Sequence, residues 1–392
     1  MNYIIFDNFR RNYLLPLTFT RPVGDIRIGI LTIREKWEHF LGEKTSTLTE
    51  GYLSTKYPAI KGDDNIMING SILPNEQLVS EIRSLGINQA LVQGEVIIAM
   101  RLTAEDLDNI DEAENMEEIE TECRYMKVNT AWEIFSKNDE ALRADFDLIT
   151  KGRKSASLSK TNTILGSDIF VEEGAKAECC TFNTSTGPIY IGKDVEIMEG
   201  SLIRGPFAIL DHSVVKMAAK IYGATTVGPY SKVGGELNNV VIFSHSNKAH
   251  DGYLGNSVIG EWCNLGADTN NSNLKNNYEL VKMWSYPDRT FVDTGLQFCG
   301  LVMGDHSKCG INTMFNTGTV VGVSSNIFGS GFQRNFIPSF TWGGTKGFNA
   351  FPLKKAIEIA ERVYSRRDKA FDTVERDILS AVNELTATNA SY

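Results

Sequence analysis

Several features that mark secreted or membrane proteins are missing from this chain of 392 residues. Its six cysteines are too few and too scattered for a disulfide framework. No apolar run approaches the roughly 20 residues that span a bilayer, and Asp7 and Arg10 come too early for a secretory signal. We therefore expect a soluble, cytoplasmic, globular protein with no membrane partner.

An excess of positive charge is also missing. The chain has 39 Lys and Arg residues against 49 Asp and Glu residues, which gives a net charge of −10. Ten of the acidic residues lie between Glu105 and Glu122, where there is no basic residue, and we predict a solvated loop there. Because no basic stripe is present, no nucleic-acid partner is expected.

What the sequence does contain is a six-residue repeat. An apolar residue recurs at every sixth position through Ile191, Ile197, Ile203, Ile209, Val215, Ile221, Val227 and Val233. We expect the register to resume at Val241, Asn247, Tyr253, Ile259 and Leu265, and again at Met303, Cys309, Phe315, Val321 and Ile327. Neither a helix nor a simple alternating strand has this period. The pattern resembles the left-handed parallel β-helix of hexapeptide-repeat proteins and predicts that fold over about residues 160–335.

The flanking regions have other patterns. Strand-like runs at Ile4–Phe6, Asn65–Leu73 and Glu95–Met100 alternate with helical spacing at Ile30–Leu41 and Asn75–Leu85, which favours an α/β domain. After the last hexad, helical spacing follows Pro352, and we expect one or two helices that cover the open end of the solenoid or a neighbouring subunit. The predicted domains are 1–155 (α/β), 156–335 (β-helix) and 336–392 (helical cap).

The segment from His250 to Asn273 interrupts the repeat with an ordered set of polar and small residues. The set comprises His250, Tyr253–Gly255, Ile259–Gly260, Asn264–Ala267, Thr269 and Asn273. Its order and spacing resemble the acetyltransferase half of the bifunctional N-acetylglucosamine-1-phosphate uridyltransferase/glucosamine-1-phosphate acetyltransferase family. The resemblance covers about residues 190–330. It implies an acetyl-CoA-dependent N-acetyltransferase of an amino-sugar 1-phosphate that works as a homotrimer with sites between subunits.

The resemblance also implies roles for single residues. His250 is the expected general base, because a protonated sugar amine is not a nucleophile until a base takes its proton. Tyr253, Asn264 and Asn273 are expected to bind the sugar phosphate, with Lys248 and Lys282 as candidate cations for the phosphate. Gly266 and Ala267 are expected to leave room for the pantetheine arm of CoA.

The chain departs from the family at two of these points. Asp268 stands where the family has the third residue of Gly-Ala-Gly, and Asn238 stands where it has a phosphate-binding lysine. These changes leave the acceptor sugar open.

The N-terminal region is similar to a shortened sugar-nucleotidyltransferase domain at Leu14–Ile30 and Ile68–Pro74. It lacks the glycine-rich phosphate loop near residue ten, and it has Ser71 in place of a metal-binding aspartate. Because Mg²⁺ prefers carboxylates, we expect nucleotidyl transfer to be weak or absent. Mg²⁺ remains a candidate cofactor of this domain. Arg10, Arg21 and Arg27 are candidate phosphate contacts; the alternative is pairing with acidic neighbours.

Two other functions fit part of the pattern. The first is a non-catalytic scaffold or regulatory subunit that binds a nucleotide sugar. The second is a γ-class carbonic anhydrase-like zinc enzyme built on His212, His245 and His250. The hexad count puts His212 and His250 on one face two coils apart, about 9–10 Å, which is too far for one metal within a subunit. We therefore predict no resident metal in the β-helix.

Overall fold

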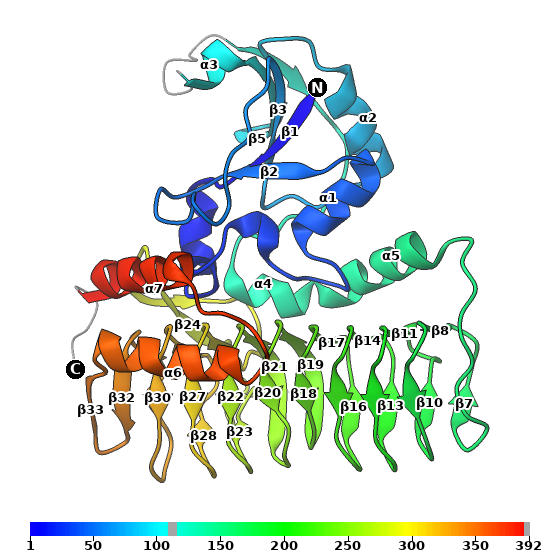
Figure 1. Cartoon of the computed structure of the whole chain (residues 1–392), viewed down its shortest axis with the longest axis vertical. Helices are drawn as coiled ribbons and strands as arrows, with labels where there is room; N and C mark the ends of the chain where they lie inside the picture. Colours follow the sequence, from blue (N-terminus) through cyan, green and yellow to red (C-terminus); the bar gives the residue numbers. More distant parts are fainter. Residues whose placement is uncertain (109–115, 388–392) are drawn as a thin grey trace. The chain divides into compact units, whose positions relative to one another are not determined.

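The computed structural model describes residues 1–108 and 116–387 (Figure 1). The chain forms two compact units. The first, which we call the N-terminal unit, comprises Met1–Leu14, Thr20–Ile26 and Leu31–Thr130. The second, the β-helix unit, comprises Leu15–Phe19, Arg27–Ile30 and everything from Ala131 onward. The predicted cap region and the helices at 131–150 both belong to this second unit.

The described part of the N-terminal unit is a six-stranded sheet with helices, as the α/β prediction requires. Its strand order is β2-β1-β3-β5-β4-β6, and β1 pairs in parallel with both β2 and β3. The strands and helices predicted here are confirmed. The elements are β1 (Asn2–Phe6), η1 (Phe9–Leu14), η3 (Val23–Asp25), α1 (Ile33–Leu41), β2 (Thr45–Leu48), β3 (Asp64–Asn69), α2 (Glu76–Ser84), β4 (Gln89–Gln93), β5 (Val96–Thr103), α3 (Ala104–Asp108) and β6 (Glu117–Glu120).

The acidic segment is not a loop throughout. Residues Glu117–Glu120 form β6, which adds to the sheet edge in parallel with β4. The loop prediction is wrong for these four residues, because an edge strand keeps its outer side in solvent and so accepts charged side chains. It is also wrong for Glu105, Asp106 and Asp108, which lie in α3. Residues 109–115 of the segment lie outside the described residues.

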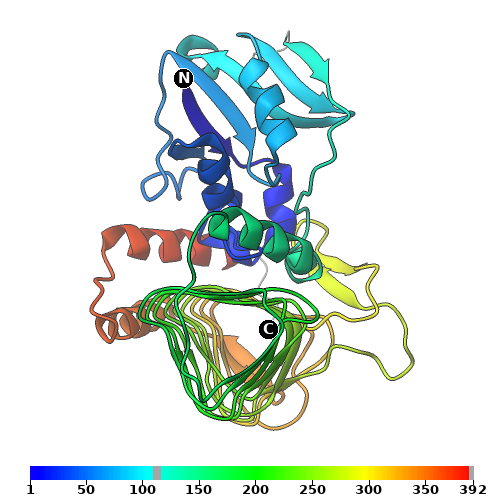
Figure 2. The ribbon, with the colours of Figure 1, turned by 90° about the vertical axis from the view of Figure 1, so that its right-hand side faces the viewer.

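The β-helix unit confirms the predicted parallel β-helix of hexapeptide repeats. Its coils stack in parallel with an offset of 18 residues at first, for example Ile191 beside Ile209 and Ile209 beside Val227. Viewed along its axis, the coil is triangular (Figure 2). All eight inward positions from Ile191 to Val233 and all five from Met303 to Ile327 are buried in one core. Cys263 and Cys309 lie in that core as well.

The strands of the coil form three parallel groups. The largest comprises β7 (Thr163–Leu165), β8 (Ile169–Val171), β10 (Thr181–Asn183), β11 (Ile189–Ile191), β13 (Leu202–Arg204), β14 (Phe207–Ile209), β16 (Lys220–Tyr222), β17 (Thr225–Val227), β19 (Glu236–Ile242), β21 (Tyr253–Ile259), β26 (Leu301–Met303), β29 (Thr319–Val321) and β31 (Phe336–Ile337). The second comprises β9 (Lys176–Ala177), β12 (Glu196–Ile197), β15 (Val214–Val215), β18 (Lys232–Val233), β20 (Asn247–Lys248), β22 (Asn264–Leu265), β27 (Lys308–Cys309) and β30 (Asn326–Ile327), with the hairpin β32 (Thr341–Gly344)–β33 (Gly347–Ala350) at its end. The third is β23 (Asn270–Asn271) with β28 (Met314–Phe315), and β24 (Lys282–Ser285) pairs with β25 (Thr290–Asp293) in an extruded loop.

The register between Val233 and Ile259 differs from the predicted one. Val227 pairs with Ile242 and Val233 with Lys248, so this coil is 15 residues long instead of 18. Val241, Asn247 and Tyr253 are therefore not the inward residues; Ile242, Lys248 and Leu254 are. A 17-residue coil follows, and Ile259 and Leu265 are inward as predicted. The short coil is what turns Tyr253 outward.

Two pairs of helices accompany the β-helix. The first pair, α4 (Ala131–Ser136) and α5 (Asn138–Thr150), was not predicted. The second pair is α6 (Leu353–Ser365) and α7 (Thr373–Thr386), and α6 runs along the coils and not over their end (Figure 1). The end is covered by the β32–β33 hairpin, whose Phe348 joins the core. Among residues 1–108 and 116–387, no helix combines the length and apolar character needed to cross a bilayer.

A column of stacked rings holds α6 in place. Residues with positive φ form one corner of successive coils, and there the rings of Tyr230, His245 and Trp262 stack at centroid distances of 4.9 and 4.1 Å. Tyr364 of α6 stacks on Trp262 at 4.0 Å. This contact explains why the helix lies along the corner: its apolar face has an aromatic surface to cover there.

Candidate active site

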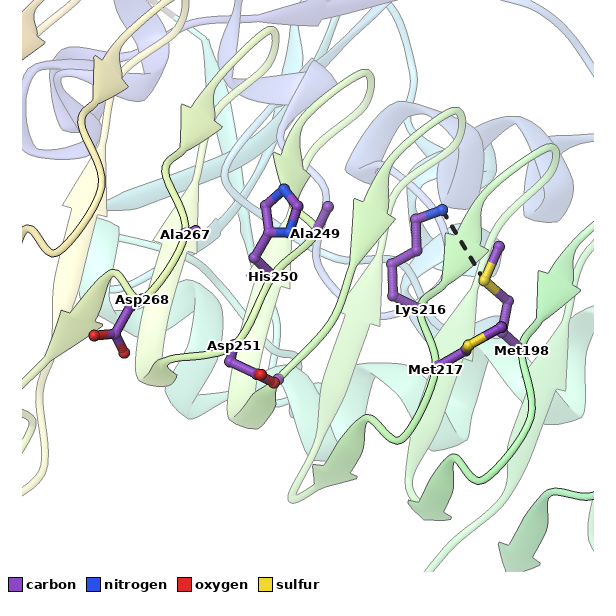
Figure 3. Close-up of a pocket in the computed structure, with 9 residues that line it drawn as sticks. Met198, Lys216, Met217, Ala249, His250, Asp251, Ala267 and Asp268 are labelled. Atoms are coloured by element: carbon purple, nitrogen blue, oxygen red, sulfur yellow. Dashed lines mark hydrogen bonds between the residues drawn. The ribbon is translucent and has the colours of Figure 1, made fainter.

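His250 lies at an exposed corner of the β-helix, in the turn that follows β20. A groove of about 660 Å³ opens beside it, lined by Met198, Lys216, Met217, Gly235, Ala249, His250, Asp251, Ala267 and Asp268. The side chains come from neighbouring coils, and the carboxylates of Asp251 and Asp268 lie below His250 in the view of Figure 3. An imidazole is thus open to a ligand in a trough whose nearest walls are Gly and Ala.

Small residues and close coil contacts shape this corner. A Cβ on Gly252, whose φ is +115°, would lie 2.2 Å from the carbonyl oxygen of Thr269 in the next coil. A Cβ on Gly266 would lie 2.5 Å from the backbone of Gly310. The amide of Asp268 donates to the carbonyl of Asp251 at 3.0 Å. The glycines therefore permit the coils to approach, and the approach fixes the path of the backbone around His250.

Lys248 does not face the groove. It occupies an inward position between Val233 and Leu265, and only 2% of its surface is exposed. Its Nζ donates to the carbonyl oxygens of Gly234 (3.1 Å), His250 and Asp251 (3.2 Å). Burial lowers the pKa of this ammonium to about 8, and the carboxylates of Asp251 and Asp268 oppose that shift. In this arrangement the ammonium is not available to a sugar phosphate.

Tyr253 and Asn273 lie together, and their role in binding the sugar phosphate stays a prediction. The Nδ2 of Asn273 donates to the Tyr253 hydroxyl at 2.9 Å and to the Oδ1 of Asn256 at 2.7 Å. Asn238 also hydrogen-bonds the hydroxyl, although burial still raises the pKa of Tyr253. The result is a patch of amides around one phenol, with the carboxylate of Glu236 close enough to raise the pKa of that phenol and with Asn238 where the family has a cation.

The structure does not bring Asn264 and Lys282 to this patch. Asn264 is exposed on β22 and its Oδ1 is 3.5 Å from Nδ2 of Asn247 on β20. Lys282 is exposed on β24, where its Nζ lies 3.9 Å from a carboxylate oxygen of Asp293. Ala267 lines the groove, whereas Gly266 serves the contact with the next coil.

Sequence reasoning missed a set of cations that the turn after α6 brings to the coil. Arg366 and Arg367, in the turn after α6, lie close enough to Lys232 to lower its pKa, as Lys216 does, although burial is the larger cause. Arg367 donates to Asn247 at 3.4 Å, and the Nζ of Lys369 lies 6.0 Å from the Tyr230 ring. The basic run at 366–369 is visible in the sequence, but nothing there shows that α6 returns it to the coil.

The N-terminal unit has a groove of its own at the carboxyl ends of β1 and β2. Its volume is about 410 Å³, and it is lined by Asp7, Asn8, Phe9, Arg11, Asn12, Leu48, Thr49, Glu50 and Gly51. Asp7 accepts hydrogen bonds from the Val23 amide (2.8 Å) and the Thr49 hydroxyl (2.6 Å), and it lies 3.4 Å from the Arg11 guanidinium. Burial raises the pKa of Asp7 to about 6.

The three arginines predicted for this region do not line that groove. Arg10 lies over the Phe9 ring at 4.6 Å, Arg21 is buried, and Arg27 belongs to the β-helix unit, where it donates to the Ile30 carbonyl. The residues around Ser71 do not fit Mg²⁺ either. The Oδ1 of Asn69 already accepts from the Ser71 hydroxyl (2.8 Å), the Ser71 amide and Asn8. No three His, Cys, Asp or Glu residues within 1–108 and 116–387 are grouped as metal ligands.

The histidines do not follow the predicted arrangement. Since Val215 pairs with Val233 and Val233 with Lys248, the residue equivalent to His212 is His245 and not His250. The prediction that His212 and His250 share a face is wrong, because the hexad count did not include the 15-residue coil. Tyr230 stacks between His212 and His245, at 4.8 and 4.9 Å. Burial lowers the pKa of His245 to about 4.

Comparison with known proteins supports the resemblance in both halves. Residues 3–154 match the family model described as sugar nucleotidyl transferase. The chain is 26% identical over 204 residues to the bifunctional protein GlmU of Methanocaldococcus jannaschii, which is 52% of this chain and 45% of that protein. It is 27% identical over 280 residues to GlmU of Methanococcus vannielii, covering 68% of this chain and 61% of the relative.

A third relative is the bifunctional sugar-1-phosphate nucleotidylyltransferase/acetyltransferase of Sulfurisphaera tokodaii, 28% identical over 36% of this chain and 35% of its own. The chain thus spans between about a third and three fifths of the length of these relatives. Among solved structures, it is similar to the N-acyltransferase AntD of Bacillus cereus (11% identity, 53% of this chain and 87% of AntD, TM-score 0.24) and to Arabidopsis UDP-N-acetylglucosamine acyltransferase (14%, 60% and 92%, TM-score 0.23). Scores this low do not establish a shared fold, so the β-helix rests on the chain's own strand pairing.

Proposed function

We propose that the β-helix unit transfers an acetyl group from acetyl-CoA to the amine of an amino-sugar 1-phosphate, with His250 as the general base. The observation that carries the proposal is the exposed imidazole of His250 on a groove walled by Ala249 and Ala267. The names of the curated relatives, which include an acetyltransferase, point to the same chemistry.

The reaction needs few groups. The imidazole nitrogen of His250 takes the proton from the sugar nitrogen as that nitrogen attacks the thioester carbonyl carbon. The C–N bond forms, the C–S bond breaks, and the leaving thiolate takes the proton back from the imidazolium. A neutral imidazole is required at the start, so the rate should fall at acidic pH.

Binding of the two substrates follows from the surroundings of the groove. Lys216, Lys232, Arg366 and Arg367 would bind the phosphates of CoA, since guanidinium and ammonium groups pair with phosphate oxygens. The hydroxyl of Tyr253 and the amides of Asn238, Asn256 and Asn273 would hold the hydroxyls of the sugar. The carboxylate of Glu236 beside Tyr253 disfavours an anion there, so the phosphate of the acceptor would be bound elsewhere.

We propose that the working form is a homotrimer, as the family resemblance implies. A shallow apolar hollow of about 560 Å³ lies on the outer face of β7, β10, β13 and β16, where Leu165 and Leu202 are 49% and 53% exposed. Exposed leucines gathered in one hollow make this face our candidate for the subunit contact. A second copy of the chain is the occupant that would also complete a site between subunits.

For the N-terminal unit we propose that nucleotidyl transfer is weak or absent. Its groove carries the carboxylates Asp7 and Glu50 against the single guanidinium of Arg11, and this balance disfavours a triphosphate. The alternative function, a non-catalytic nucleotide-sugar scaffold, is supported by the same groove and the same missing phosphate loop.

The test is a turnover assay of the full chain with acetyl-CoA and a panel of amino-sugar 1-phosphates, following release of the CoA thiol. Thermal shift with acetyl-CoA and with nucleotide sugars runs in parallel, since a ligand stabilises the native state by mass action. Thiol release that depends on the amino sugar supports the transferase. Stabilisation by a nucleotide sugar without any thiol release supports the scaffold instead.

A further inference from the structure

The core of the β-helix contains one charged side chain directly behind the His250 corner. Lys248 takes the inward position that Val233, Leu265 and Cys309 take in the coils on either side. A buried ammonium is costly unless its donors are satisfied. Here all three contacts are backbone carbonyls, and two of them belong to His250 and Asp251.

These contacts tie the corner to the coil before it. The Gly234 carbonyl belongs to that preceding coil, whereas the His250 and Asp251 carbonyls belong to the turn itself. The Asp251 carbonyl also accepts from the Asp268 amide at 3.0 Å, and the Gly252 carbonyl accepts from the Glu236 amide at 3.2 Å. One ammonium therefore joins two successive coils at the residue that carries the imidazole, and the Asp251 carbonyl that it holds is shared with the amide of Asp268 in the third.

Asp268, one of the residues that depart from the family, carries a charge opposite to that of Lys248. Asp268 replaces a glycine beside His250, and its carboxylate and that of Asp251 favour the charged form of Lys248. Two unusual residues in adjacent coils thus stabilise each other: an inward lysine and an acidic residue at the groove.

We propose that Lys248 is a positioning residue, whose ammonium holds the carbonyls of Gly234, His250 and Asp251 and thereby fixes the direction in which His250 enters the groove. This inference rests on the proposed function of His250, but the tether itself does not. A misplacement of about 1 Å at a reacting group costs roughly 10²-fold in rate, so a tether of this kind has a measurable effect on catalysis.

The test compares Lys248→Met with Leu265→Met in the full chain. Both variants put methionine at adjacent inward positions, but only the first removes hydrogen bonds. Hydrogen exchange is followed in peptides that contain the amides of Glu236 and Asp268, with the Gly322 amide, which donates to Ile337 at 2.8 Å, as a remote reference. We expect about tenfold faster exchange at Glu236 and Asp268 in Lys248→Met, no change at Gly322, and no change anywhere in Leu265→Met.

The second measurement is steady-state kinetics of the same variants. Lys248→Met should lower kcat by about 10- to 100-fold with KM for acetyl-CoA within about twofold, because the tether orients the base and does not touch CoA. Faster exchange with unchanged kcat would make Lys248 merely structural and overturn the proposal, as would unchanged exchange. If the wild type transfers no acetyl group, the proposed function is wrong. The hydrogen-exchange result then still shows whether Lys248 holds the backbone of this corner. Lys248→Leu replaces Lys248→Met if the latter does not fold.

Discussion

The two units of this chain both match parts of sugar-nucleotide enzymes, and they differ in the residues that would meet the ligand. In the β-helix unit, His250, Tyr253, Ala267 and Asn273 occur in the family's order, and His250 and Ala267 line one groove. In the N-terminal unit, the sheet and a groove at its carboxyl edge are present, but the phosphate loop is absent and Ser71 is engaged with Asn69. A scaffold can therefore match a family model while the ligand-binding side chains have changed.

The linings of the two grooves carry the same balance of charge, but the β-helix unit has further cations. Its groove lining has Asp251 and Asp268 against Lys216, and Lys216, Arg366 and Arg367 all act on Lys232. In the N-terminal groove the one lining guanidinium, Arg11, is paired with Asp7 and lies 3.6 Å from Glu50. Our proposal that the β-helix unit binds CoA therefore depends on Lys232, Arg366 and Arg367, which lie outside the groove lining.

The largest expected effect is loss of the β-helix fold. Ile203→Asp puts an unpaired carboxylate into the core, whereas Leu202→Asp puts the same group on the outer face of the same strand, β13. We expect Ile203→Asp to unfold the β-helix unit, since nothing there can pair the charge. Leu202→Asp should stay folded. Circular dichroism and thermal melting of both variants check this, and a folded Ile203→Asp variant of unchanged Tm would refute the register.

The second-largest expected effect is the difference between the rates of nucleotidyl transfer and acetyl transfer, measured in one preparation. With Mg²⁺, UTP or TTP, and a sugar 1-phosphate, we expect nucleotidyl transfer to be at least about 10³-fold slower than acetyl transfer, given that even one missing donor to a developing charge costs about 10²–10³-fold. Release of pyrophosphate is the readout. Nucleotidyl transfer at a comparable rate would remove the contrast between the units.

The sequence predicts most of the inward positions of the β-helix, but not all of them. The inward positions follow from the repeat, because a fixed period places the same side chain at the same corner of each coil. The 15-residue coil between Val227 and Ile242 could not be predicted, since Val241 is as apolar as its neighbour and is also buried. Because of this short coil, Lys248, which we expected to bind the phosphate, lies in the core.

Contacts distant in sequence account for the remaining differences. The stacking of Tyr364 on Trp262 brings the basic turn after α6 to the coil, and no local pattern encodes that contact. Helices α4 and α5 were missed. The buried face of α5 contains the polar residues Asn138 and Asp145 beside Ala141 and Leu142, so the sequence does not show a purely apolar helical face there. By contrast, Tyr253 and Asn273 were identified from the motif alone, and they form a hydrogen bond.

A moderate effect is expected in the pH dependence of stability, with opposite signs in the two units. The pKa of Asp7 is raised to about 6, so the folded N-terminal unit binds this proton more tightly than the unfolded chain does. The stability that Asp7 contributes is therefore fully present below about pH 4 and is lost as the pH rises through 6. In the β-helix unit the lowered pKa values of His245 (about 4) and Lys248 (about 8) make stability rise between about pH 4 and 6.5 and again between about pH 8 and 10.

Each of these groups contributes on the order of 1–3 kcal/mol, at about 1.4 kcal/mol per pKa unit. Urea unfolding at pH 5, 7 and 9.5, followed by hydrogen exchange in peptides of each unit, separates the two dependences. The contrast is lost if both units gain stability together as the pH rises. Asp7→Asn is the matched variant, in which the dependence of the N-terminal unit between pH 4 and 6 should disappear.

The smallest effect concerns assembly. Leu202→Asp, already the folded control above, places a charge in the apolar hollow that we propose as the subunit contact. We expect the trimer to dissociate at about tenfold higher protein concentration than the wild type, a change of about 2.7 kcal/mol per trimer, because dissociation into three subunits depends on the square of the concentration. Light scattering across a dilution series measures it. A wild type that is monomeric at micromolar concentration would contradict the trimer.

The central claim is that acetyl transfer takes place at His250, and substitution of two histidines tests it most directly. His250→Ala and His212→Ala each remove an exposed imidazole from the β-helix unit, and His212, which stacks on Tyr230 at 4.8 Å, does not line the groove. We predict that His250→Ala lowers kcat by about 10²–10⁴-fold with binding of acetyl-CoA and Tm nearly unchanged, while His212→Ala keeps the wild-type kcat. Equal rates for His250→Ala and the wild type would contradict the account.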